Sequence, residues 1–189
     1  MNSGDKLFSS LSELSTSDDN LPPIEKWNPE FCGDIDILIK ANGEWWHEGS
    51  PIKRKNLYTL FSRVLLKEGN QYFLITPVEK LAIKVEWQPF VIQDFELVKK
   101  DGTTCYVMHD NCGNKIILTD ANQLAVSRFN DLDLPIIHVR RNLFASFSRS
   151  CYYRLIDQAD IVNDPIFKDK GLQRAQITSA GIDFPLGYF

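Results

Sequence analysis

The dipeptide Asn42-Gly43 constrains the fold of this chain more than any other short feature, because it is the strongest local signal for a two-residue β-hairpin turn. Before it, three isoleucines in residues 35–39 fall at every second position, a period typical of a half-buried strand. Residues 44–48 follow it and contain two adjacent tryptophans. The sequence therefore predicts a hairpin of two antiparallel strands at this point.

A helix is predicted directly after this hairpin. Gly49 ends the second strand, and Ser50 followed by Pro51 combines an N-cap hydroxyl with proline at the first helical position. Apolar residues then recur at the spacing of one helix face, and they are Leu57, Leu60, Phe61, Val64 and Leu65. We expect residues 68–70 to end this helix and a strand at residues 72–75 to follow.

The same order of hairpin and helix returns in the second half. Residues 136–140 and 144–147 predict a hairpin through Arg141-Asn142, and Ser148 or Ser150 then caps a helix that begins near Arg149. Further strands are predicted at residues 91–99, 103–109, 115–119 and 175–182. We therefore expect an α+β fold made of two structurally similar hairpin-plus-helix units, a domain duplication.

Composition and charge narrow the classes of function. A hydrophobic content of 43% and a charged content of 24% are ordinary for a globular domain. The net charge of −4 argues against a protein that binds nucleic acid in bulk. No apolar run reaches the roughly 18 residues of a membrane span, and the N-terminus shows no secretion signal. We expect a cytoplasmic protein that does not bind membranes.

Neither a metal site nor a catalytic centre is predicted. Cys105, His109 and Cys112 could bind a metal, but their spacing fits no standard zinc pattern, and residues 111–114 fit a hairpin turn better. His47 and Glu79 could be assembled into an acid–base pair, yet no nucleophile, zinc-protease or phosphate-loop motif accompanies them. We predict no cofactor, and a hydrolase is the least favoured alternative.

Two segments carry basic residues and no acidic ones. Residues 1–50 contain three basic and ten acidic residues, whereas residues 51–66 contain Lys53, Arg54, Lys55 and Arg63 without an acid. Residues 134–156 likewise contain Arg140, Arg141, Arg149 and Arg154 without an acid. Both segments lie near the start of a predicted helix, where an anion is favoured by the helix dipole. If the two units face each other, these segments could line one cleft; solvated surface charge is the alternative.

Several runs of residues are similar to an uncharacterised bacterial family, catalogued as domain of unknown function family 1285. The runs are WHEGSPIKR, LFSRVL, YFLITPVEK, PIIHVR, LFASFSR and SAGIDFPLG. The resemblance covers nearly everything from Trp27 to Gly187, and it departs at Trp87, where an acidic residue is expected. It implies the duplication described above, with a β-rich second unit that is superficially similar to a pleckstrin-homology domain.

The boundaries that follow are a flexible tail at residues 1–24, an N-terminal α+β domain at 25–90 and a C-terminal β-rich domain at 91–189. The tail is rich in Ser, Asp and Glu, a composition that buries little apolar surface. The resemblance further implies a ligand site at the interface of the two domains, for a nucleotide-like molecule, and a role in signal transduction. A protein–protein interaction domain without a small ligand is the alternative.

The resemblance also suggests which residues bind the ligand. Arg54 would contact a phosphate, and Arg140 and Arg149 could do the same, because arginine matches phosphate oxygens geometrically. The remaining candidates are Trp46, His47 and Tyr153, for stacking on or hydrogen bonding to a base, together with Lys53 and Thr76. Packing within the hairpin is the alternative role for Trp46. Glu79 and Lys80 are expected to form a structural ion pair.

Overall fold

The computed structural model describes residues 21–100, 102–119, 124–163 and 172–188. These residues form two compact units, which divide between Pro89 and Phe90 and are described separately below. The prediction of a flexible tail falls mainly on residues 1–20, which lie outside the described residues.

The N-terminal unit is built on one six-stranded sheet in the order β3-β2-β1-β6-β5-β4. Its elements are η1 (Ile24–Lys26), β1 (Phe31–Ile39), β2 (Trp45–His47), β3 (Ser50–Pro51), α2 (Lys55–Arg63), β4 (Leu65–Glu68), β5 (Gln71–Ile75) and β6 (Lys80–Val85). The predicted hairpin is confirmed, since β1 and β2 pair antiparallel with Ile39 opposite Trp45. β1 and β6 are parallel neighbours, and their pairing at the centre of the sheet joins the β1–β2–β3 strands to the β4–β5–β6 strands.

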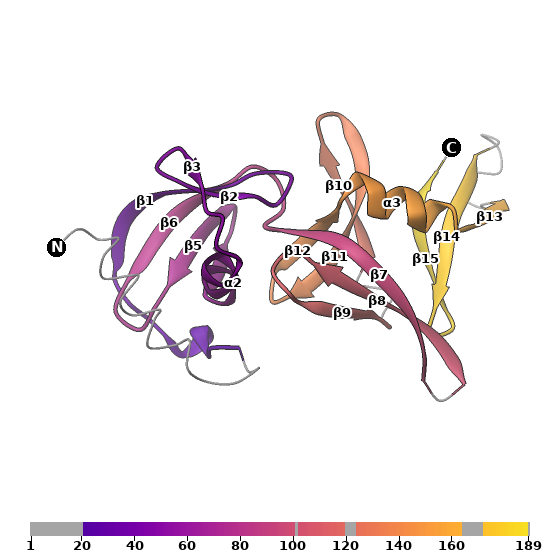
Figure 1. The fold of residues 1–189 in the computed structure, drawn as a ribbon, viewed down its shortest axis with the longest axis horizontal. Helices are drawn as coiled ribbons and strands as arrows, with labels where there is room; N and C mark the ends of the chain where they lie inside the picture. The colour runs from indigo at the N-terminus through magenta and orange to yellow at the C-terminus, as the bar shows by residue number, and fades with distance from the viewer. Residues whose placement is uncertain (1–20, 101, 120–123, 164–171, 189) are drawn as a thin grey trace. The chain divides into compact units, whose positions relative to one another are not determined.

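Helix α2 covers one face of this sheet, on the inner side of its curve (Figure 1). Side chains alternate between faces along a strand. Trp45 therefore points towards the helix, where its ring centroid lies 6.0 Å from that of Phe61. Both side chains are fully or almost fully buried. The predicted apolar face of the helix is thus the side that builds the core of this unit.

The predicted start and end of this helix are wrong. Ser50 and Pro51 form a short strand that pairs with His47 and Trp46, and α2 begins four residues after Pro51. The reason is a tight turn at Glu48-Gly49, both with positive φ, which returns the chain along β2 before the helix can start. At the other end, α2 stops at Arg63, and the residues expected to be its last turn form β4, which pairs with β5 at the place of the predicted strand.

The C-terminal unit contains two sheets and one helix. Its elements are β7 (Phe90–Lys100), β8 (Thr103–Asp110), β9 (Lys115–Leu118), β10 (Leu124–Phe129), β11 (Leu132–Arg140), β12 (Leu143–Phe147), α3 (Arg149–Ile156), β13 (Asp160–Asn163), β14 (Gln173–Ser179) and β15 (Ile182–Tyr188). The first sheet has the order β10-β11-β12-β7-β8-β9, and the second has the order β13-β14-β15. The predicted hairpin β11–β12 is confirmed, and the strands predicted at residues 91–99 and 103–109 are β7 and β8, which pair antiparallel. β10, β13 and β15 were not predicted.

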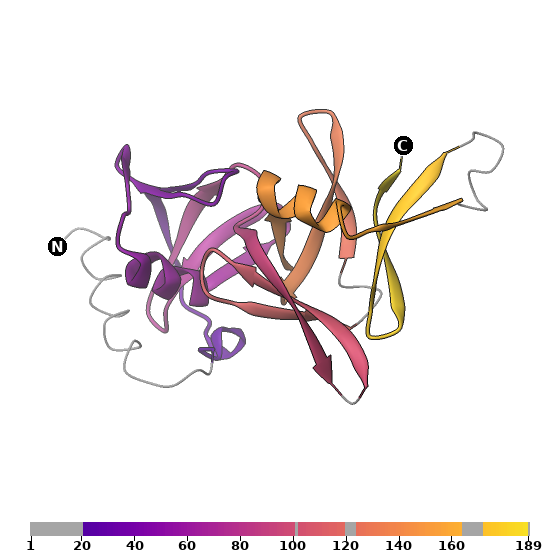
Figure 2. The same cartoon turned by 45° about the vertical axis from the view of Figure 1, so that its right-hand side comes forward.

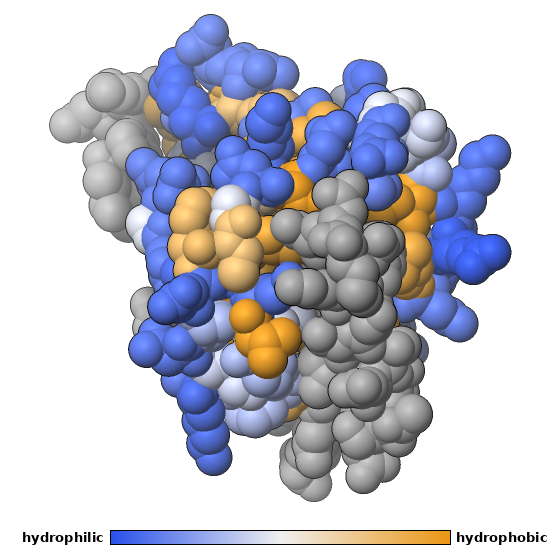
Figure 3. Space-filling model, turned by 90° about the vertical axis from the view of Figure 1, so that its left-hand side faces the viewer, coloured by the Kyte–Doolittle hydropathy of each residue, from blue (hydrophilic) through white to orange (hydrophobic). Residues whose placement is uncertain are grey.

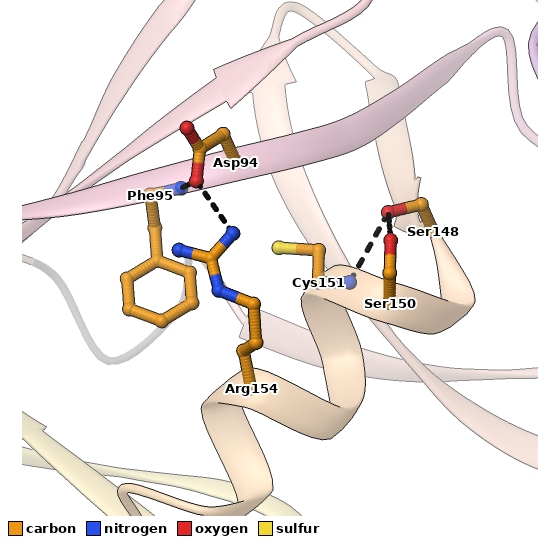
Figure 4. Close-up of polar contacts among 6 residues, drawn as sticks. All are labelled: Asp94, Phe95, Ser148, Ser150, Cys151 and Arg154. Atoms are coloured by element: carbon orange, nitrogen blue, oxygen red, sulfur yellow. Dashed lines mark hydrogen bonds and ion pairs between the residues drawn. The ribbon is translucent and has the colours of Figure 1, made fainter.

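Helix α3 is bonded to β7 at both of its ends, and at its start the Ser148 N–H donates to the Ile92 carbonyl at 2.8 Å. Ser148 is the N-cap, and its hydroxyl oxygen accepts a hydrogen bond from the backbone N–H of Cys151, as the sequence predicted for one of the two serines. Near the other end, the Arg154 guanidinium donates to Asp94 at 2.8 Å and lies over the Phe95 ring (Figure 4). The hydrogen bond from Arg154 lowers the pKa of the Asp94 carboxyl, with a smaller contribution from the Phe95 N–H.

The buried hydroxyl of Ser179 joins the two sheets of this unit. It accepts a hydrogen bond from the Tyr106 N–H at 2.9 Å and donates to the Leu118 carbonyl. Next to it, the Ala180 N–H donates to the Thr104 carbonyl at 2.9 Å. Residues at the turn between β14 and β15 therefore provide hydrogen-bond partners for backbone groups of β8 and for the last carbonyl of β9.

The predicted α+β duplication is wrong. Strands account for 57% and helices for 13% of the residues that the structure describes, so this part of the chain is mostly β. The N-terminal unit is a single curled sheet, whereas the C-terminal unit combines a six-stranded and a three-stranded sheet. Helical periodicity was found at two places, and each place holds one helix of eight or nine residues. Neither helix in the described ranges is long and apolar enough to cross a bilayer.

Candidate functional site

The N-terminus of α2 is the most positively charged helix end in the described part of the N-terminal unit. Arg54 is the N-cap residue, and no side chain caps the first turn, which also lacks an acidic residue. Lys53, Arg54 and Lys55 are all exposed, and their side chains form no hydrogen bond or ion pair with another described residue. Cations at this end oppose the helix dipole, each by about 0.3–1 kcal/mol, and an anion would reverse that effect.

His47 and Trp46 point to opposite faces of the sheet because they are consecutive residues of β2. His47 shares the face of Trp45, on which α2 packs. Trp46 lies on the other face, where the Lys40 ammonium sits 3.7 Å from its ring centroid. The indole N–H of Trp46 donates to the Glu44 carboxylate at 3.2 Å. One ligand beside α2 can therefore meet His47 but not Trp46, whose contacts are those of hairpin packing.

Thr76 is fully buried and shapes the turn between β5 and β6. Its hydroxyl oxygen accepts hydrogen bonds from the N–H groups of Val78 and Glu79, at 3.4 and 3.1 Å. The hydroxyl is thus engaged by its own turn. The expected ion pair of Glu79 with Lys80 is wrong, since Lys80 pairs with Glu68 at 2.5 Å.

In the C-terminal unit, Arg140 belongs to a buried polar network. Its side chain is 9% exposed, its guanidinium donates to the Asn114 amide oxygen at 2.7 Å, and it stacks over the Phe90 ring. Asn114 in turn donates to the carboxylate of Asp110, which is 5% exposed. The other carboxylate oxygen of Asp110 accepts from the N–H groups of Cys112 and Asn114. Residues 111–114 form the predicted turn between β8 and β9, and Arg140 stabilises it.

Arg149 and Tyr153 lie together on the exposed side of α3. They are one helical turn apart, and the guanidinium of Arg149 donates to the Tyr153 hydroxyl from Nε and Nη2, each at 3.3 Å. The same guanidinium lies 5.5 Å from the centre of the Tyr153 ring, which is 52% exposed. Of the predicted residues in this unit, the structure brings these two together and places Arg140 in the interior.

The Asp110 network predicts a pH dependence of stability. Burial raises the pKa of the Asp110 carboxyl, although hydrogen bonds from Asn114 and Cys112 and the charge of Arg140 oppose this. The pKa of an aspartate in the unfolded chain is about 3.9. When the pKa in the folded state is higher, the folded protein is stabilised by holding a proton, fully so below the unfolded-state pKa. This stabilisation is lost as the pH rises through the folded-state pKa. We therefore expect wild type to lose stability relative to Asp110→Asn as the pH rises above about 4. Denaturant unfolding at a series of pH values measures this, and a constant difference would contradict it.

Sequence reasoning missed this network because its members are distant in the chain. Asp110 and Asn114 carry a local signal, since side chains of this type often bond to nearby backbone in turns. Nothing local connects them with Arg140, which is 26 positions beyond Asn114. Among the residues that the structure describes, no three His, Cys, Asp or Glu side chains gather into a metal site.

Comparisons with known proteins cover both units. Residues 22–88 match the family described as "Domain of unknown function (DUF1285), N-terminal domain", and residues 89–186 match "Protein of unknown function (DUF1285), C-terminal domain". No curated protein matches this chain.

Two solved structures are similar to it. A DUF1285 family protein from Silicibacter pomeroyi DSS-3 has 30% identity and a TM-score of 0.76, over 95% of this chain and 93% of that one. A DUF1285 family protein from Shewanella baltica OS155 has 27% identity and a TM-score of 0.53, over 66% of this chain and 92% of that one.

Proposed function

Because this chain belongs to the DUF1285 family, whose two domains it contains in order, we propose that it is a ligand-binding regulatory module with a signalling role. Its ligand is a nucleotide-like anion, and a phosphate group of that ligand binds at the N-terminus of α2. The observation that carries this proposal is the set of three exposed cations, Lys53, Arg54 and Lys55, at a helix start without a capping side chain or an acid.

The physical argument is one of charge. The first turn of a helix offers free N–H groups and the positive end of the dipole, so three added cations repel it and one another. A phosphate removes this repulsion, and the guanidinium of Arg54 matches two of its oxygens. His47 lies on the same face of the sheet as α2 and can donate a hydrogen bond to the ligand.

The test is binding of phosphate-bearing probes: inorganic phosphate, pyrophosphate, AMP and ATP. We expect at least one of them to raise the melting temperature of the full chain and to bind in calorimetry. Charge-assisted contacts contribute about 1.5–3 kcal/mol, so Arg54→Ala should weaken binding roughly tenfold or more. Lys53→Ala should also weaken it.

Lys84→Ala is the matched control for Lys53→Ala. Lys84 is also an exposed lysine of this unit. Leu38 is paired with Lys84 on one side and with Trp46 on the other, so Lys84 shares the sheet face of Trp46, away from α2. We expect it to bind the probe as wild type does. The proposal fails if no probe binds, or if Arg54→Ala and Lys84→Ala bind it equally well.

A further inference from the structure

The outer strand β10 of the C-terminal unit has one hydrogen-bonding edge that pairs with none of the described strands. It pairs with β11 on one side, and the two strands are joined by Asn130-Asp131, both with positive φ. Such a two-residue loop makes the flanking Phe129 and Leu132 a hydrogen-bonded pair. By alternation, the backbone N–H and C=O groups of every second residue point away from β11. These residues are Leu124, Val126 and Arg128, and at this edge none bonds to another described residue.

The other sheet edges in the described parts of the chain carry features that oppose strand addition. β3 has two residues, one of them Pro51, and β4, β9 and β13 have four each. β15 contains Pro185, and its pairing with β14 has a register shift. β10 has six residues and no proline. Its one charged residue, Arg128, lies 3.6 and 3.7 Å from carboxylates of its own hairpin, on Asp131 and Asp133.

We propose that β10 pairs antiparallel with β10 of a second copy of this chain, about a two-fold axis at Val126. In this register Val126 faces Val126 of the second copy, and Arg128 faces Leu124. The three outward-facing residues then form three hydrogen-bonded pairs, which exchange six backbone hydrogen bonds. A register centred on Arg128 would instead place two like charges directly opposite each other, which is destabilising.

The side chains favour a second copy as the occupant. Val126 is 57% exposed, and a symmetric contact covers it with an identical apolar side chain. The aliphatic part of Arg128 lies against Leu124, while its charged end remains beside its own two carboxylates. The β10–β11 hairpin also projects from the rest of its unit in both views of Figures 1 and 2. The product is one continuous sheet through two C-terminal units.

The first test is the molecular mass in solution. We expect light scattering or sedimentation to give 21.7 kDa at low concentration and twice that mass at high concentration. Val126→Pro removes the outward N–H and leaves the bonds between β10 and β11 in place, so this variant should stay monomeric at every concentration. Val126→Thr keeps both the N–H and the branched side chain, and it should dimerise within a few-fold of wild type.

The second test is the register. In a Cys32→Ser background, which removes the exposed cysteine and leaves three buried ones, a short thiol cross-linker should join two copies of Val126→Cys. Two copies of Arg128→Cys should not be joined, because residues offset by four positions lie roughly 14 Å apart. A mixture of Leu124→Cys and Arg128→Cys should be joined.

The proposal is overturned if wild type keeps the monomer mass at all concentrations. It is equally overturned if a folded Val126→Pro variant dimerises like wild type, or if Arg128→Cys cross-links to itself. Circular dichroism establishes whether Val126→Pro is folded. If it is not, Val126→Lys takes its place, because two lysines directly opposite each other prevent the same contact while every backbone N–H is kept.

Discussion

Replacing Phe61 with alanine is expected to lower the unfolding free energy of the N-terminal unit by about 3–5 kcal/mol. The ring is completely buried, and it packs against Trp45 between α2 and the sheet. Truncation therefore removes apolar contacts and leaves a cavity that the surrounding strands cannot fill. Urea unfolding followed by tryptophan fluorescence measures this loss in the relevant unit, because all four tryptophans lie within residues 1–89.

Phe31→Ala is the matched control. Phe31 belongs to the same unit, but its side chain is 59% exposed, and its ring lies nearly perpendicular to that of Phe73. Figure 3 shows one face of the molecule on which apolar surface lies among hydrophilic surface, and exposed single residues of this kind contribute little to stability. We expect a loss of about 1 kcal/mol or less. An equally small loss for Phe61→Ala would mean that α2 does not build the core.

Replacing Arg140 with alanine is expected to cost about 3–5 kcal/mol, which is typical of breaking a buried charged network. The variant leaves the Asn114 amide oxygen without its donor, and it removes the positive charge of Arg140 that acts on the buried Asp110 carboxyl. It also removes the guanidinium that covers the Phe90 ring. Circular dichroism during urea unfolding is the suitable measurement, since this unit has no tryptophan.

Arg149→Ala is the control for this variant. Both arginines were predicted to bind phosphate, but Arg149 lies at the exposed start of α3, where its guanidinium contacts Tyr153 one helical turn away. We expect its unfolding free energy to stay within about 0.5 kcal/mol of wild type. If Arg140→Ala were equally mild, the network would not stabilise this unit.

The start of α2 shows how pairing overrides a local signal. An N-cap serine contributes about 1 kcal/mol to a helix. Ser50 and Pro51 instead pair with β2, because Glu48-Gly49 adopts a turn with positive φ at both positions. Glutamate is uncommon in this conformation, so the turn was hard to see in the sequence. Arg54 thereby becomes the N-cap, which places three cations at the helix start.

The candidate site was predicted as a set of residue types, and the structure decided which of them share a surface. Trp46 and His47 were both predicted, from the family resemblance, to stack on or hydrogen-bond to the base of one ligand. A strand separates adjacent residues to opposite faces. Arg140 and Arg149 were grouped because both lie in a segment free of acids, yet one is buried and the other exposed.

The sequence by itself determined the local elements with strong periodicity: the Asn42-Gly43 hairpin, the apolar face around Phe61, the serine cap of α3 and the family. Each depends on residues close together in the chain. Only the tertiary structure decided the mostly β architecture, in which β1 pairs with β6 and β7 with β12 in parallel. Parallel partners are necessarily joined by long connections, and pairing between distant segments leaves no period or motif in either one.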